Sequence, residues 1–281
     1  MTPTLSDPAE PLAPDDLIAL ARAGWRLGAR YCTACGGYHR MWGALRAAGV
    51  VGGADADEAV LAPLLTRALT PGARVLLAGS ADPGILDMVA RAAGTTPLRV
   101  MVADICATPL KVIETLRPYP AIQVETLQLD LTTLDHEAAW DVIVSHSMLP
   151  FVGPEARLEI LTRLRRALAP GGRLLLAMRS ASAMEDADAA RHDEAWIARA
   201  QAKIARSGIP LPGPADEFDA ALVRYAALRP ARLWVTTPEQ VEALLRSVGF
   251  RQVETFRSQE SSELTIGGRT YAKRGYILEA R

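Results

Sequence analysis

The 281-residue sequence is short of aromatic residues, of cysteine and of net charge, and each shortage excludes a class of function. Aromatic residues make up 5% of the chain, too few for the stacking platforms that bind single-stranded nucleic acid. The 31 basic and 32 acidic residues nearly cancel, so we expect no nucleic acid and no membrane surface as a partner. Three cysteines do not imply a disulfide framework.

Long apolar runs are also missing. No stretch approaches the roughly 20 unbroken apolar residues of a membrane span. Residues 1–14 lack the basic and apolar regions of a signal peptide, so we expect a cytoplasmic protein. Hydrophobic residues are plentiful at 49%, enough for one large α/β domain with appendages or for two small domains.

Apolar runs alternate with helical patterns through most of residues 71–281 and predict an α/β fold. Near-continuous apolar strands separated by helices indicate a parallel sheet covered on both faces. The predicted strands are 74–78, 98–103, 122–127, 142–145 and 173–178, and the predicted helices are 85–93, 108–116 and 154–168. Thr237 and Gln240 predict a capping box at the start of a later helix. The last strands, 251–256 and 274–280, flank Gly267-Gly268 and predict an antiparallel pair.

Three stretches do not follow this alternation. Residues 1–14 hold four prolines and few apolar residues, which predicts a flexible arm. Residues 15–70 show only helical patterns and predict an N-terminal helical cap. A polar, Ala- and Arg-rich helical stretch at about 183–232 interrupts the strands and predicts an inserted helical lid.

The segment Arg74-Val-Leu-Leu-Ala-Gly-Ser-Ala-Asp-Pro-Gly84 predicts a buried strand, a glycine-bearing turn and the start of a helix. The next strand ends on Asp104. Such a turn brings backbone N–H groups close to a ligand, and an acid at the second strand end accepts hydrogen bonds from a ribose. The front half of the alternating region therefore predicts a nucleotide site.

Three further segments, 140–149, 164–176 and 241–250, resemble the fourth strand, the Pro-Gly-Gly turn before strand five, and the last helix of the class I S-adenosylmethionine-dependent methyltransferases. The resemblance covers roughly residues 60–281 without the inserted helices. It implies a doubly wound, seven-stranded, mostly parallel sheet with a C-terminal antiparallel strand pair, an N-terminal helical cap and an inserted helical lid. It also implies S-adenosyl-L-methionine as the cofactor.

The first loop departs from the family pattern of an acid followed by three alternating glycines. Leu77 stands in place of the acid, Ala81 replaces the second glycine, and Pro83-Gly84 replaces or shifts the third, while Gly79 matches. Asp82 is then the candidate to bind the methionine end. The residues that the resemblance places at the cofactor are Gly79, Ser80, Ala81, Asp82, Gly84, Asp104, Ile105, Asp130, Leu131, Ser145 and His146.

Two of these acids have alternative interpretations. Asp104 is expected to bind both ribose hydroxyls, or else to cap the following helix. By the resemblance, Asp130 contacts the adenine amino group and Leu131 lies beside the ring; alternatively Asp130 is an exposed turn residue.

The candidate catalytic bases are His146, Tyr31 and His39. His146 ends the fourth strand, where open α/β sheets bind ligands, and a neutral imidazole can take a proton near pH 7. The alternative is a hydrogen-bonded structural histidine. Tyr31 and His39 lie in the helices before the first strand, which often cover the cofactor in the family; the alternative is that they dock those helices on the core.

Cys32, Cys35 and His39 have the spacing of a zinc site. They supply three ligands, whereas a closed structural site needs four, and no second Cys/His cluster follows. We therefore expect no metal and interpret the two cysteines as small packing residues.

The favoured function is a methyltransferase that acts on a small molecule. One alternative is an enzyme of the same fold that consumes S-adenosylmethionine without methyl transfer, for example by cyclising its amino-acid chain and releasing methylthioadenosine. A second alternative is a non-catalytic binding partner, supported by Leu77 and the missing glycines. A dinucleotide oxidoreductase is disfavoured because Gly-x-Gly-x-x-Gly is incomplete. The sequence leaves a homodimer open.

Overall fold

A computed structural model describes residues 13, 15–116, 118–181, 186–228, 237–266 and 269–281. The expected arm, residues 1–14, therefore lies almost wholly outside the described residues. Within the described part, no helix combines the length and the apolarity that crossing a bilayer requires.

Seven strands form one mixed sheet in the order β3-β2-β1-β4-β5-β7-β6, which confirms the predicted fold class. Strands β1 to β5 pair in parallel, and β7 pairs antiparallel with both β5 and β6. The order reverses at β1 and β4, so ligands are expected outside the carboxyl ends of these two strands. The strands are β1 (Arg74–Ala78), β2 (Leu98–Asp104), β3 (Ile122–Gln128), β4 (Trp140–His146), β5 (Leu168–Ala181), β6 (Val253–Ile266) and β7 (Arg269–Ala280).

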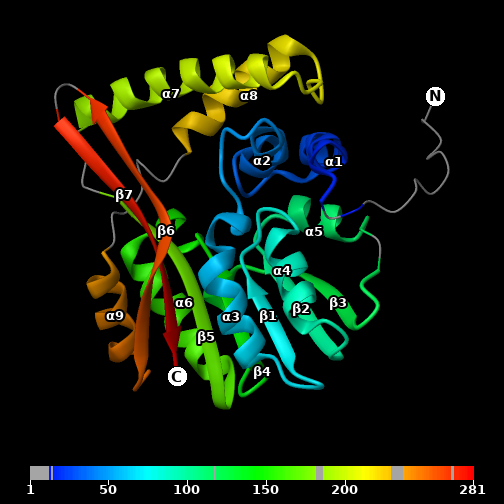
Figure 1. Cartoon of the computed structure of the whole chain (residues 1–281), viewed down its shortest axis with the longest axis vertical. Coiled ribbons are helices and arrows are strands. Elements are labelled where there is room, and N and C mark those ends of the chain that lie inside the picture. The colour runs from blue at the N-terminus through cyan, green and yellow to red at the C-terminus, as the bar shows by residue number, and fades with distance from the viewer. Residues whose placement is uncertain (1–12, 14, 117, 182–185, 229–236, 267–268) are drawn as a thin grey trace.

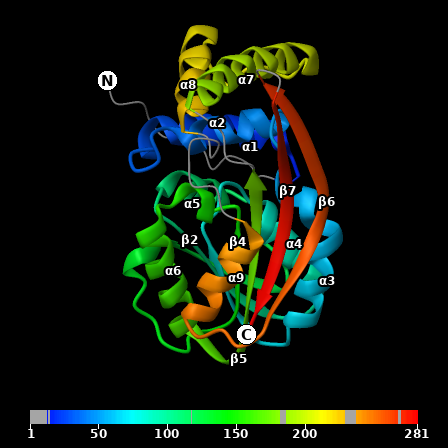
Figure 2. The ribbon, with the colours of Figure 1, turned by 90° about the vertical axis from the view of Figure 1, so that its left-hand side faces the viewer.

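Helices cover both faces of the sheet (Figures 1 and 2). One face packs on α3 (Glu58–Ala68), α4 (Gly84–Ala93) and α5 (Ala107–Ile113) through a single apolar cluster. The other face packs on α6 (Pro154–Ala167) and α9 (Pro238–Ser247). Consecutive residues of β1 point to opposite faces, so Val75 and Leu77 join the first cluster and Leu76 and Ala78 the second.

A third layer of helices lies across one end of the sheet, clearest in Figure 2. It consists of α1 (Leu17–Tyr31), α2 (Tyr38–Ala47), α7 (Asp186–Ser207) and α8 (Ala215–Ala227), which share their own apolar cluster. The N-terminal pair and the inserted pair thus meet in space, although the sequence separates them. From the stretch expected as a cap, α1 and α2 lie in this layer, whereas α3 packs on the sheet.

Some boundaries differ from those predicted. The last two strands are much longer than expected and pair from Val253 with Ala280 to Ile266 with Arg269. Polar residues such as Ser261 and Glu263 hide this extension from a hydrophobicity pattern, because that part of the hairpin projects past the parallel strands towards α7 (Figure 1). The predicted capping box is confirmed: Thr237 accepts from the Gln240 N–H, and Gln240 accepts from the Thr237 N–H.

Candidate active site

The loop after β1 is held by hydrogen bonds within the chain. Gly79 has φ of +80°, and a Cβ built there would lie 2.9 Å from Cγ of Met148. The Ser80 N–H donates to Asp104 Oδ2 over 2.9 Å. The N–H of Gly84 donates to Asp82 Oδ1 over 2.8 Å, so Asp82 satisfies one free donor at the start of α4. Gly79 is therefore required by its backbone conformation and by its close neighbour.

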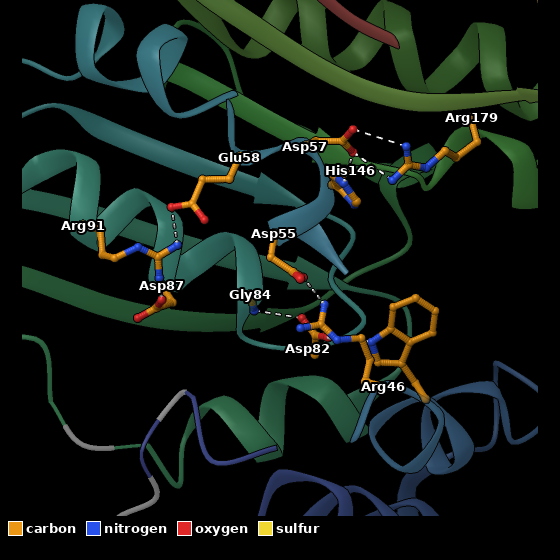
Figure 3. Close-up of polar contacts among 11 residues, drawn as sticks. Arg46, Asp55, Asp57, Glu58, Asp82, Gly84, Asp87, Arg91, His146 and Arg179 are labelled. Atoms are coloured by element: carbon orange, nitrogen blue, oxygen red, sulfur yellow. Dashed lines mark hydrogen bonds and ion pairs between the residues drawn. The ribbon is translucent and has the colours of Figure 1, made fainter. Parts of the chain in front are cut away.

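The other oxygen of Asp82 is bound from the helical layer (Figure 3). Trp42 Nε1 donates to Asp82 Oδ2 over 2.7 Å, and Arg46 Nε lies 3.7 Å from the same oxygen. Arg46 also pairs with Asp55 at 2.8 Å. Asp82, the residue expected to replace the missing loop acid, thus carries three contacts with its own chain. The cavity lined by Arg46, Asp82 and Gly84 measures about 20 Å³, room for about one water molecule.

Asp104 joins the loops after β1 and β2. It is 7% exposed, and its second oxygen accepts the Cys106 N–H over 2.7 Å. Burial raises the pKa of Asp104, while the charge of His39 and the bonds from Cys106 and Ser80 act in the opposite direction. Both oxygens accept one backbone bond, and a carboxylate offers about four acceptor sites. The structure therefore shows a structural role for Asp104 and leaves acceptor capacity for a ligand.

The neighbouring predicted residues differ in exposure. Ile105 is 46% exposed, which is unusual for a large apolar side chain beside a buried acid. Asp130 is exposed, and its Oδ1 accepts both the N–H and the hydroxyl of Thr132, so it caps the short helix η2 (Leu131–Thr133). Leu131 is buried. These residues follow the adjacent strands β2 and β3, so they share one edge of the sheet.

His146, at the end of β4, belongs to a buried charged network (Figure 3). Its Nε2 lies 2.9 Å from Oδ2 of Asp57, which is 3% exposed. The next residue, Ser147, has φ of +55°, a conformation that non-glycine residues seldom adopt outside functional or strained sites. Ser145 Oγ is buried and makes no hydrogen bond within the described part of the chain.

Asp57 and Arg179 complete this network, and no sequence pattern points to either residue. Asp57 ends the short helix η1 (Ala54–Asp57), and Arg179 lies near the end of β5. The Arg179 guanidinium binds both carboxylate oxygens, each over 3.2 Å. Burial opposes the charge on Asp57, but the bond to His146 and the charge of Arg179 outweigh it, so its pKa is lowered. A carboxylate at Nε2 fixes the orientation of the imidazole ring.

Tyr31 and His39 lie elsewhere. The guanidinium of Arg30 covers the Tyr31 ring at 5.2 Å. His39 lies with Cys32, Cys35 and Cys106, and the ligand atoms of these four residues are within 4.8 Å of one another. Among the described residues, neither Tyr31 nor His39 hydrogen-bonds to the network of Asp57, His146 and Arg179.

Stacked aromatic rings hold the helical layer together over the end of β4. The Tyr38 ring of α2 stacks on Trp42 at 5.6 Å and on Tyr225 of α8 at 4.9 Å. Its edge meets Phe151 at 5.0 Å, in the short helix η3 (Leu149–Phe151) that follows β4. Trp196 of α7 stacks on Tyr225 in turn. The inserted helices are thus joined to the N-terminal pair, and Tyr38 of that pair contacts the turn after β4.

Comparisons with known proteins give the following findings. A family model described as a methyltransferase domain matches residues 79–176. A carboxy-S-adenosyl-L-methionine synthase from Pseudomonas putida is 30% identical over 136 residues, which cover 45% of this chain and 53% of that protein. The protein of the same name from Ectopseudomonas mendocina is 38% identical over 72 residues, 26% of this chain and 27% of its own. The chain thus spans about half the length of these curated relatives, or less.

Solved structures with a similar backbone include a SAM-dependent methyltransferase from Archaeoglobus fulgidus. It is 11% identical, with a TM-score of 0.48, and the match covers 79% of this chain and 93% of that one.

Proposed function

Because residues 79–176 match a family model described as a methyltransferase domain, we propose that the chain transfers a group from S-adenosylmethionine to a small molecule. His146 would take the proton from the acceptor. The observation that carries this proposal is the network of His146, Asp57 and Arg179. It lies at the carboxyl end of β4, next to the point where the strand order reverses.

The residues along β1 to β3 fit an adenosyl group. Asp104 keeps acceptor sites for two ribose hydroxyls, and Gly79 adds no side chain of its own to the loop. Ile105 offers an exposed apolar surface that an adenine ring would cover. Asp130 and Leu131 stand at the end of the neighbouring strand, as the family resemblance implies.

To bind the amino-acid part of S-adenosylmethionine, the side chains around Asp82 would have to move apart. Asp82 is bound by Trp42 and Arg46, and the cavity beside it has room for about one water molecule. We propose that Trp42 and Arg46 leave Asp82 when the amino-acid part binds. The carboxylate would then meet the ligand ammonium in place of the Arg46 guanidinium.

When bound, S-adenosylmethionine supplies an electrophilic methyl group on its sulfonium. The contribution of the chain is to place the acceptor in line with that group and to exclude water. With Asp57 at Nε2, the His146 imidazole presents Nδ1 as the site that accepts a proton. Asp57 then stabilises the imidazolium, and Arg179 keeps Asp57 ionised.

The helical layer supports a small acceptor. Helices α1, α2, α7 and α8 lie over this end of the sheet, and the rings around Tyr38 tie them to the turn after β4. A macromolecular acceptor would require this layer to separate. The balanced charge of the chain also offers no electrostatic attraction for nucleic acid.

A thermal-shift series with S-adenosylmethionine, S-adenosylhomocysteine, methylthioadenosine and NAD tests the cofactor. We expect the adenosyl sulfur compounds to raise the melting temperature by mass action, and a shift with NAD alone would contradict the assignment. In turnover assays, His146→Gln is expected to lower kcat about 10²–10⁴-fold, the usual contribution of a general base. His136→Gln, at an exposed histidine, is the matched control and should leave kcat unchanged.

A second candidate follows from the curated relatives, whose name states that they make carboxy-S-adenosyl-L-methionine. The chain would then modify S-adenosylmethionine itself. Mass spectrometry of the products separates the candidates. S-adenosylhomocysteine indicates methyl transfer, a carboxylated sulfonium indicates the activity in the relatives' name, and methylthioadenosine indicates cyclisation. Tight binding without any turnover would favour a non-catalytic partner.

A further inference from the structure

All three cysteines of the chain meet in one place, together with one histidine. Cys32 and Cys35 lie at the end of α1 and in the turn after it, His39 lies in the first turn of α2, and Cys106 directly precedes α5. Their sulfur atoms and one imidazole nitrogen are all within 4.8 Å of one another. Cys106 is 74 positions from Cys32, so the fold supplies a fourth ligand that the local Cys-x-x-Cys-x-x-x-His pattern lacks.

The spacing of these atoms suits a tetrahedral metal ion. Zinc–sulfur bonds of about 2.3 Å place two thiolates about 3.8 Å apart at the corners of a tetrahedron. The sulfur atoms of Cys32 and Cys106 are 3.9 Å apart. The largest separation in the group exceeds the ideal edge by about 1 Å, a difference that side-chain rotation can close.

Two further observations favour an ion over simple packing. The Nδ1 atom of His39 is buried and has no hydrogen-bond partner among the described residues, so the protein alone leaves this imidazole incompletely satisfied. The Cys32 sulfur also lies 3.1 Å from the hydroxyl of Thr108, which is fully buried. A hydroxyl that donates to a metal-bound sulfur is a common supporting contact in metal sites.

We propose that Cys32, Cys35, His39 and Cys106 bind one Zn²⁺ in a closed Cys₃His site. Binding joins one Zn²⁺ to three thiolates and a neutral imidazole and releases three protons from the thiols, without any change of oxidation state. Four protein ligands leave no open position for a substrate, so the ion is structural.

The site would fasten the helical layer to the sheet. It joins the connection between α1 and α2 to the start of α5, two residues after Asp104. The cavity of about 240 Å³ that is lined by Cys32, Gly37, Arg40 and Arg224 gives an entry path. The proposal stands without the proposed function, because it requires only that these four side chains bind metal.

The test is the metal content of the full chain, purified without a polyhistidine tag. Inductively coupled plasma mass spectrometry is expected to find about one zinc per chain. Cobalt exchange should give the visible bands of tetrahedral Co²⁺ and a thiolate-to-cobalt charge-transfer band. Cys106→Ser and His39→Ala should lose at least nine-tenths of the metal, on the order of what removal of one ligand implies. His136→Ala is the matched control at an exposed histidine and should keep all of it.

A further variant distinguishes the loss of a metal ligand from the loss of folding. His39→Cys keeps a four-ligand set and should retain one zinc per chain, with a stronger charge-transfer band in the cobalt form. The proposal is overturned if the wild-type chain holds no zinc after reduction and zinc reconstitution. It is also overturned if Cys106→Ser keeps the full metal content, or if thiol titration finds a disulfide that persists through reconstitution.

Discussion

Asp57 and Asp104 are two buried aspartates at the same end of the sheet, yet their surroundings move their pKa values in opposite directions. Asp57, on the β4 and β5 side, faces His146 and Arg179, and its pKa is lowered. Asp104, on the β2 side, accepts hydrogen bonds only from backbone N–H groups among the described residues, and burial raises its pKa.

The difference indicates that the two aspartates have different roles. A carboxylate that is paired with a guanidinium and an imidazole has its charge compensated, and its role is to hold those partners in place. A buried carboxylate that accepts only backbone hydrogen bonds keeps acceptor sites that hydroxyl groups can fill. We therefore propose that the β4 and β5 side carries the chemistry and that the β2 side binds the ligand, and three predictions can break that proposal.

The largest expected effect is on stability, from Asp57→Ala. The substitution removes the buried carboxylate that pairs with Arg179 and His146, and breaking a buried ion pair costs about 3–5 kcal/mol of unfolding free energy. Urea denaturation measures the change. Asp55→Ala is the matched control two positions away: Asp55 pairs with Arg46 but is 66% exposed, so we expect a loss below about 1 kcal/mol. Equal losses of unfolding free energy in the two variants would show that the buried network stabilises the fold no more than an exposed ion pair does.

The next effect is on ligand affinity, from Asp104→Asn. The amide keeps an acceptor for the backbone but removes the charge, and a hydrogen bond to a charged group contributes about 1.5–3 kcal/mol. Calorimetric titration should therefore find S-adenosylhomocysteine bound about 10–100-fold more weakly. Asp130→Asn, at an exposed turn, should change affinity less than Asp104→Asn. Unchanged affinity in Asp104→Asn would show that Asp104 only connects the two loops and does not bind the ligand.

The sequence predicts what depends on neighbouring residues. Three local patterns are confirmed. They are the apolar strands whose carboxyl ends form the candidate site, the capping box of Thr237, and the family resemblance. It does not predict contacts that the fold makes between distant residues. Asp57 and His146 are 89 positions apart, and nothing in Ala54-Asp-Ala-Asp57 marks its last acid as the partner of a histidine.

The fourth ligand, Cys106, had a signal in the sequence that local spacing conceals. Cys106 directly follows the predicted ribose acid and its neighbour, so it lies at the same edge that the helices before β1 are expected to cover. The covering helices bring Cys32 and Cys35 to Cys106 at that edge. The long polar part of the last hairpin had no such signal, because its pairing extends beyond the apolar core.

The smallest expected effect is the pH dependence of stability, because the two aspartates oppose each other. Asp57, with a lowered folded pKa, contributes stability above the unfolded value of about 3.9, and that contribution is lost as the pH falls through the folded pKa. Asp104, with a raised folded pKa, contributes stability below about 3.9, and that contribution is lost as the pH rises through the folded pKa. Urea midpoints measured between pH 3 and pH 7 should therefore fall less steeply towards acid in Asp57→Asn than in the wild type. In Asp104→Asn they should fall more steeply, because the group that gains stability in acid is gone. If both substitutions changed the acid slope in the same direction, the contrast between the two sides of the site would be wrong.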